Sequence, residues 1–145
     1  MISINGTITI ARPPEAVFSF LADLNNIPKW EGGVLESKVA SSGPTALGTK
    51  FTEKVKMDFG TFDAACEVVS FEPPRLIGFT AVSKKLNYKG EYTMDAVPEG
   101  TKMTVSGQAG LSGMMKLMEG IMKGQLQKEV DRNLTKIKEL VESTQ

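Results

Sequence analysis

Few side chains in this sequence could do acid–base chemistry, because its 145 residues include no histidine and a single cysteine, Cys66. Histidine is the usual proton carrier near neutral pH and the commonest metal ligand. Its absence excludes a nucleophile–histidine triad and, with only one cysteine, a structural zinc site. Any catalysis would have to use carboxylates, tyrosines, lysines or arginines. The sequence predicts neither a metal site nor a cofactor.

Glu53 is the carboxylate with the most unusual position. It alternates with Phe51, Val55 and Met57 along a predicted strand, and alternate residues of a strand share one face. A carboxylate buried on that apolar face would have a raised pKa and could act as an acid or a base. The alternative is that Glu53 lies near a strand end and reaches water, in which case the sequence identifies no catalytic residue.

Two tyrosines, Tyr88 and Tyr92, share one face of a later predicted strand. Buried tyrosine hydroxyls usually find a hydrogen-bond partner, which here could be Glu53 or an oxygen of a ligand. Gly90, Gly107 and Ala64 are small residues of the same inner surface, and they favour a cavity because they leave space. The alternative is that these faces form an ordinary packed core.

The composition is that of a globular domain, with 41% hydrophobic and 23% charged residues. Lys plus Arg and Asp plus Glu each number 17, and this zero net charge argues against a nucleic-acid partner. No stretch approaches the roughly 20 apolar residues of a transmembrane segment, and the N-terminus lacks the pattern of a signal peptide. We expect one domain over residues 1–145, located in the cytoplasm, with no intrachain disulfide. The oligomeric state is open.

Apolar periodicity predicts a strand, two short helices, about six further strands and one long helix. The first strand contains alternating isoleucines and ends before Pro13-Pro14, and the second short helix ends near Trp30. The later strands are each bounded by turn residues and are joined by short connections, which is typical of an antiparallel meander. They are expected at residues 34–41, 49–59, 62–71, 76–82, 88–97 and 101–109.

From Leu111 to about Glu142 apolar residues recur at intervals of three and four, which predicts a helix on the order of 48 Å long. A bent sheet can bury its concave face only against another element, and this helix is the only one large enough. The fold class is therefore α+β, a curved antiparallel sheet wrapped around a long C-terminal helix. Residues 111–124 contain four methionines and three glycines, and we interpret them as a deformable wall that admits a ligand. The alternative is a loosely packed helix end, whereas residues 130–141 have the regular spacing of an anchor.

Four sequence segments, in this order along the chain, resemble those of a known superfamily, and the resemblance covers nearly the whole chain. They are residues 11–23, where the first strand enters a helix through prolines, residues 26–30 with the tryptophan, the corner at residues 71–76, and the closing helix. The chain resembles the START-like, or Bet v 1-like (SRPBCC), superfamily, and within it the polyketide cyclase/dehydrase and lipid transport branch. The resemblance implies a helix-grip fold whose cavity, between sheet and final helix, binds sterols, lipids, polyketides, quinones or other apolar molecules. It implies no single activity and transfers no catalytic residue.

The sequence therefore favours a binding or carrier protein for an apolar small molecule. The alternative is an enzyme of the polyketide cyclase/dehydratase type, working without metal and using Glu53 and a tyrosine as acid and base. A protein-interaction module is disfavoured, because the outer strand positions are polar. The residues expected to bind the ligand are Trp30, Phe51, Glu53, Val55, Met57, Tyr88, Tyr92, Met103, Met114, Met118 and Met122.

Overall fold

The computed structural model describes residues 1–58 and 60–144, and it has the expected α+β architecture. Seven strands form one antiparallel sheet in the order β1-β7-β6-β5-β4-β3-β2, so that the first strand pairs with the last. The strands are β1 (Ile2–Ile10), β2 (Val34–Val39), β3 (Lys50–Met57), β4 (Gly60–Glu72), β5 (Leu76–Val82), β6 (Leu86–Val97) and β7 (Gly100–Leu111). The helices are α1 (Pro14–Ala22), η1 (Leu24–Asn26), α2 (Ile27–Trp30), η2 (Gly113–Met118) and α3 (Glu119–Ser143). The expected strand at residues 49–59 includes Phe59, which lies outside the described residues.

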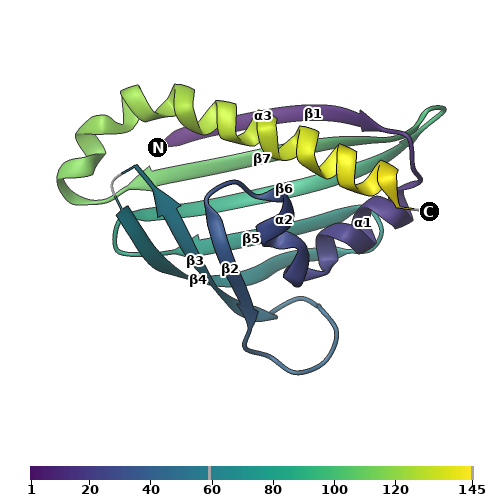
Figure 1. The fold of residues 1–145 in the computed structure, drawn as a ribbon, viewed down its shortest axis with the longest axis horizontal. Helices are drawn as coiled ribbons and strands as arrows, with labels where there is room; N and C mark the ends of the chain where they lie inside the picture. The colour runs from purple at the N-terminus through teal and green to yellow at the C-terminus, as the bar shows by residue number, and fades with distance from the viewer. Residues whose placement is uncertain (59, 145) are drawn as a thin grey trace.

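The helices cover one face of the curved sheet. Figure 1 shows α3 running alongside β1 and β7, with its C-terminal end near α1 and with α2 beside β2. Most buried apolar residues form one core between these layers, to which α3 contributes Leu134, Ile137 and Val141. The C-terminal half of the long helix thus occupies the anchoring position that its regular spacing predicts. No helix within the described residues is both long and apolar enough to span a membrane.

The segment from α1 to α2 places the first part of the site. Pro14 occupies the first turn of α1, where a missing N–H costs nothing, and Val17, Phe18 and Leu21 are buried beneath it. The Asp23 carboxylate then accepts a hydrogen bond of 3.1 Å from the Asn25 N–H and starts the turn that leads into α2. Because the chain turns in this way, Trp30 at the end of α2 is buried, and the next residue, Glu31, reaches the inner face of the sheet.

The start of the long helix differs from the prediction. Strand β7 continues to Leu111, which pairs with Leu86 of β6, and the regular α-helix begins only at Glu119, after a 3-10 helix. Glu119 fixes this boundary, because its carboxylate accepts hydrogen bonds from the Leu111 N–H at 3.0 Å and from the N-terminal amine at 2.9 Å. Helical spacing places Met114 and Met118 on the buried side, but the 3-10 turn exposes them, with exposed fractions of 87% and 43%.

Candidate ligand-binding cavity

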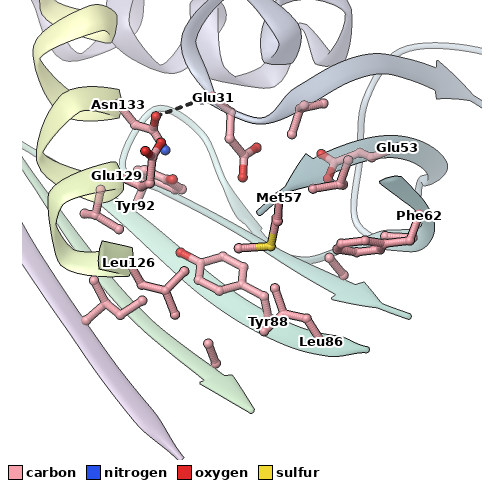
Figure 2. A pocket seen from close by; sticks show the side chains of 18 residues that line it. Glu31, Glu53, Met57, Phe62, Leu86, Tyr88, Tyr92, Leu126, Glu129 and Asn133 are labelled. Carbon is pink, nitrogen blue, oxygen red and sulfur yellow. Dashed lines mark hydrogen bonds between the residues drawn. The ribbon is translucent and has the colours of Figure 1, made fainter. Parts of the chain in front are cut away.

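A cavity of about 120 Å³ lies between the inner face of the sheet, the end of α2 and the middle of α3. Its wall is mostly apolar and includes Ile4 of β1, Val55 of β3, Ala109 of β7 and Val130 of α3. Its polar side chains come from the residue after α2 and from β3, β6 and α3, as Figure 2 shows. An apolar enclosure with a few convergent polar groups is the usual form of a small-molecule site.

The cavity adjoins a groove on the surface, of about 440 Å³, between α3 and the turn that joins α2 to β2. Gly32, Met57, Leu126 and Glu129 line both the cavity and the groove. The two spaces are therefore neighbours on this side of the molecule. A small recess of about 20 Å³ adjoins the cavity on the other side and is lined by Trp30, Phe51 and Cys66 among others.

Glu53 points into the cavity from β3 and is only 7% exposed. Strand β3 is an inner strand, so Glu53 is held between Ser37 of β2 and Ala64 of β4. Burial raises the pKa of its carboxyl to about 7, while a hydrogen bond with the Cys66 thiol acts in the opposite direction. The carboxyl therefore changes its charge close to neutral pH.

Glu31 is a second carboxylate of the cavity, and the sequence analysis did not identify it. It follows α2, where its N–H donates to the Ile27 carbonyl at 2.8 Å before the backbone turns extended, and its side chain enters the cavity (Figure 2). Burial raises the pKa of the Glu31 carboxyl well above its usual range, and the nearby Glu53 raises it further. The next residue, Gly32, donates its N–H to Asn133 Oδ1 at 2.9 Å, which ties this turn to α3.

Tyr88 and Tyr92 reach the cavity from β6. Tyr92 is buried and packs edge-on against Trp30, with ring centroids 5.8 Å apart. Burial raises the pKa of both phenols, and the two hydroxyls interact through a hydrogen bond. Both tyrosines therefore stay neutral at physiological pH and offer hydroxyl donors and acceptors rather than charge.

The two glycines of the inner surface hold the Tyr88 ring instead of leaving empty space. A Cβ atom built on Gly107 would lie 2.8 Å from Tyr88 Oη and 3.1 Å from Cε1, and Gly90 is covered by the same ring. The expectation that these glycines open the cavity is therefore wrong, because the neighbouring tyrosine uses the space. Ala64, by contrast, does line the cavity.

This contact gives a testable expectation for Gly107→Ala. The added methyl group forces the Tyr88 ring away, and overpacking of this kind costs about 1–3 kcal/mol of unfolding free energy. In a Tyr88→Ala background the additional cost should disappear, because the ring is gone. Gly110→Ala on the same strand is the matched control, since a Cβ there meets no atom within 4 Å. Urea unfolding of the four variants measures the coupling, and equal costs for Gly107→Ala in both backgrounds would contradict it.

The structure brings together only some of the residues expected to bind a ligand. Glu53, Val55, Met57, Tyr88 and Tyr92 line the cavity. Trp30 and Phe51 line the adjoining recess, and Met122 lines the surface groove.

The other three expected residues lie elsewhere. Met103 is fully buried in the core, where β7 pairs with Ile8 of β1 and Met94 of β6, and it lines none of these three spaces. Met114 and Met118 are exposed on η2 and line none of them either. The sequence did not identify Glu31 or the cavity residues of α3. The α3 residues could have been found from their helical spacing of i, i+3, i+4 and i+7, and they are Leu126, Glu129, Val130 and Asn133.

Among the residues that the structure describes, no group of three or more His, Cys, Asp or Glu side chains is arranged to hold a metal ion. The described side chains at the cavity include two carboxyls with raised pKa and two phenols, in a mostly apolar wall. Such a set can bind the polar end of an apolar molecule or exchange a proton with it.

Solved structures of other proteins share this fold. A START superfamily protein from Mycobacterium smegmatis superposes with a TM-score of 0.82 at 11% sequence identity, covering 99% of both chains. A protein from Thermus thermophilus gives a TM-score of 0.81 at 17% identity, covering 96% of both chains. The di-domain aromatase/cyclase StfQ of the steffimycin biosynthetic pathway gives 0.77 at 15% identity, and the match covers 98% of this chain and 51% of StfQ.

These identities are low, so the structural similarity speaks for the fold alone. No curated protein matches the sequence. The sequence does match a family model, described as polyketide cyclase / dehydrase and lipid transport, over residues 1–142. Together with the helix-grip fold, this match is consistent with the binding of apolar ligands. The chain belongs to the polyketide cyclase/dehydrase and lipid transport family.

Proposed function

We propose that the protein binds and carries an apolar small molecule, of the lipid, polyketide or quinone kind, in the cavity between the sheet and α3. The observation that supports this most strongly is the cavity itself, a mostly apolar space with a polar end and an adjoining surface groove. The body of the ligand would lie against Ile4, Val55 and Val130, and its polar group would lie at Glu31, Glu53 and the two tyrosines. The family match and the fold support the same proposal.

The cavity volume provides a direct test. Ala81 lines both the cavity and the recess, so an Ala81→Leu substitution fills part of the space. Ala65→Leu on the same sheet is the control, because Ala65 is exposed and lines neither space. We expect native mass spectrometry of the protein, purified without denaturation, to show a retained apolar molecule that Ala81→Leu loses and Ala65→Leu keeps.

Binding in solution can be followed through Trp30, the only tryptophan, which lies beside the cavity. A neutral probe such as 1-octanol should change its fluorescence, with an affinity about tenfold lower for Ala81→Leu than for Ala65→Leu. The proposal would be wrong if the protein retains no ligand and the two variants respond alike to the probe.

An enzyme of the cyclase/dehydratase type is the second candidate, and the position of Glu53 favours it. A carboxyl with a pKa of about 7 lines the same cavity as two phenols, which is a suitable arrangement for proton transfer to a β-keto substrate. If the protein is such an enzyme, Glu53→Gln should lower turnover of a poly-β-ketone by about 10²–10⁴-fold. Glu139→Gln, on the exposed face of α3, is the matched control. Under the carrier proposal the unsubstituted protein shows no turnover.

A further inference from the structure

We propose that the ligand of this cavity is an apolar amine, whose protonated amino group lies between Glu31 and Glu53. This inference rests on the proposed function, ligand binding in the same cavity, and narrows the ligand from any apolar molecule to a cationic one. Three features of the structure support it: the acidic side chains of the cavity wall, the ion pairs that the chain already makes, and the aromatic residues beside the two carboxyls.

The wall of the cavity contains acidic side chains and no basic ones. Three of its eighteen described lining residues are carboxylates, and none is lysine or arginine. Glu129 is already paired, since its Oε1 lies 2.8 Å from Nη1 of Arg132. Glu31 and Glu53 have no ion pair with any described residue. Figure 2 shows both side chains directed into the same part of the cavity, beside Met57.

Two carboxylates beside an apolar wall are costly unless a cation joins them or they bind protons. Removing a carboxylate from water carries a penalty that only ion pairing or protonation offsets. An ammonium group is compact, has three donors and can contact both carboxylates at once. A fatty acid or another anionic ligand would add a third negative charge to the same space, so the wall disfavours it.

The aromatic residues beside the carboxyls suit the same ligand. Tyr92 lies edge-on to Trp30 and Phe79, and Tyr88 and Tyr92 line the cavity together with Glu31 and Glu53. Ring faces attract cations, and the phenol oxygens can accept hydrogen bonds from an ammonium group.

The chain also leaves this end of the cavity unsatisfied. Trp30 is 3% exposed, and its Nε1 has no acceptor among the described residues. Trp30 lines the recess together with Glu31 and Glu53. A buried donor without a partner is uncommon in folded proteins. An ammonium group has no lone pair and cannot accept this N–H, so the Trp30 donor calls for a separate acceptor, such as a water molecule, beside the cation.

Three ligands of equal length and different charge test the proposal: octylamine, 1-octanol and octanoate. Titration at pH 8, followed by Trp30 fluorescence, should give octylamine at least about tenfold tighter binding than octanol, since hydrogen bonds to charged groups are the stronger ones. Octanoate should bind most weakly. Glu31→Gln and Glu53→Gln should each narrow the ratio of amine to alcohol affinity, whereas Glu139→Gln should preserve it.

A second titration of the unsubstituted protein, at pH 5, requires no variant to fold. Alkylamines stay protonated at both pH values, because their pKa is about 10. The Glu53 carboxyl, with a pKa of about 7, takes up a proton between pH 8 and pH 5, and the raised pKa of Glu31 keeps that carboxyl protonated at pH 5, so the amine should lose its advantage there. The titratable or charged groups that face Glu53 are Glu31 of the α2 end, Cys66 of β4, Tyr88 and Tyr92 of β6, and Glu129 of α3 with its partner Arg132.

The possible outcomes separate this inference from the proposed function. Equal affinities for octylamine and octanol, or tightest binding of octanoate, would overturn the amine proposal and leave apolar ligand binding in place. No binding of any of the three would overturn both. A preference for the amine that is the same at pH 5 and pH 8 would show that the two carboxyls are not its cause.

Discussion

Replacing Glu53 by Gln is expected to raise the free energy of unfolding by about 3 kcal/mol at pH 8 and to change it little at pH 4. The effect follows from the burial of a carboxyl that has no cation beside it. At pH 8 the folded protein holds this group as an anion, which the apolar surroundings destabilise. Glutamine has nearly the same shape and carries no charge, so the penalty is absent.

The sign of the pH dependence follows from the two pKa values of Glu53. In the folded protein it keeps its proton up to about pH 7, and in the unfolded chain it loses the proton near pH 4.5. Between these values the folded state binds more protons than the unfolded state, so the free energy of unfolding falls as the pH rises, by about 1.4 kcal/mol per pH unit. The contribution of Glu53 to this fall is complete above pH 7, and Glu53→Gln should lack that contribution.

Urea unfolding at several pH values between 4 and 8 measures this slope. Glu31 has its pKa shifted in the same direction, so Glu53→Gln should keep a smaller slope that Glu31→Gln removes in the double variant. Cys66, Tyr88 and Tyr92 all have raised pKa values and stay neutral over this range, so they do not add to it. Glu139→Gln on the surface is the control and should follow the unsubstituted protein. Parallel curves for Glu53→Gln and the unsubstituted protein would show that Glu53 is solvated.

The fold could be predicted because its signals are local and periodic. Alternating isoleucines define β1, prolines start α1, and regular aliphatic spacing defines the second half of α3. Glu53 was identified in the same way, because a carboxylate in register with Phe51, Val55 and Met57 is visible in one strand. In each case the spacing of the apolar residues indicates which face of the element is buried.

The rest of the cavity could not be predicted, because it depends on contacts between distant segments. Glu31 stands after a short helix, where no periodic pattern assigns a face, and only the turn tied to Asn133 brings it inside. Helical spacing likewise could not show that Glu119 sets the start of α3 or that a 3-10 turn exposes Met114. The Tyr88 ring covers the glycines through a tilt along the strand, which alternation alone does not describe.

The second large effect is expected on the free energy of unfolding, from a substitution in the C-terminal half of α3, which anchors this helix to the core. Ile137 is fully buried in the core beneath the C-terminal half of α3, whereas Ile121 of the first turns is 69% exposed. Ile137→Ala should therefore cost about 2–5 kcal/mol of unfolding free energy, through lost burial and the cavity left behind. Ile121→Ala makes the same chemical change on the same helix and should stay within about 0.5 kcal/mol of the unsubstituted protein.

Urea unfolding at a fixed pH compares the two variants. Because the same helix carries Leu126 and Val130 of the cavity wall, Ile137→Ala should also weaken binding of 1-octanol, as the helix is held less firmly against the sheet. Ile121 lines neither the cavity nor the groove, so its variant should bind octanol normally. Similar costs for the two substitutions would mean that α3 is not anchored through its C-terminal half, and the cavity that depends on this packing would then lack a fixed wall.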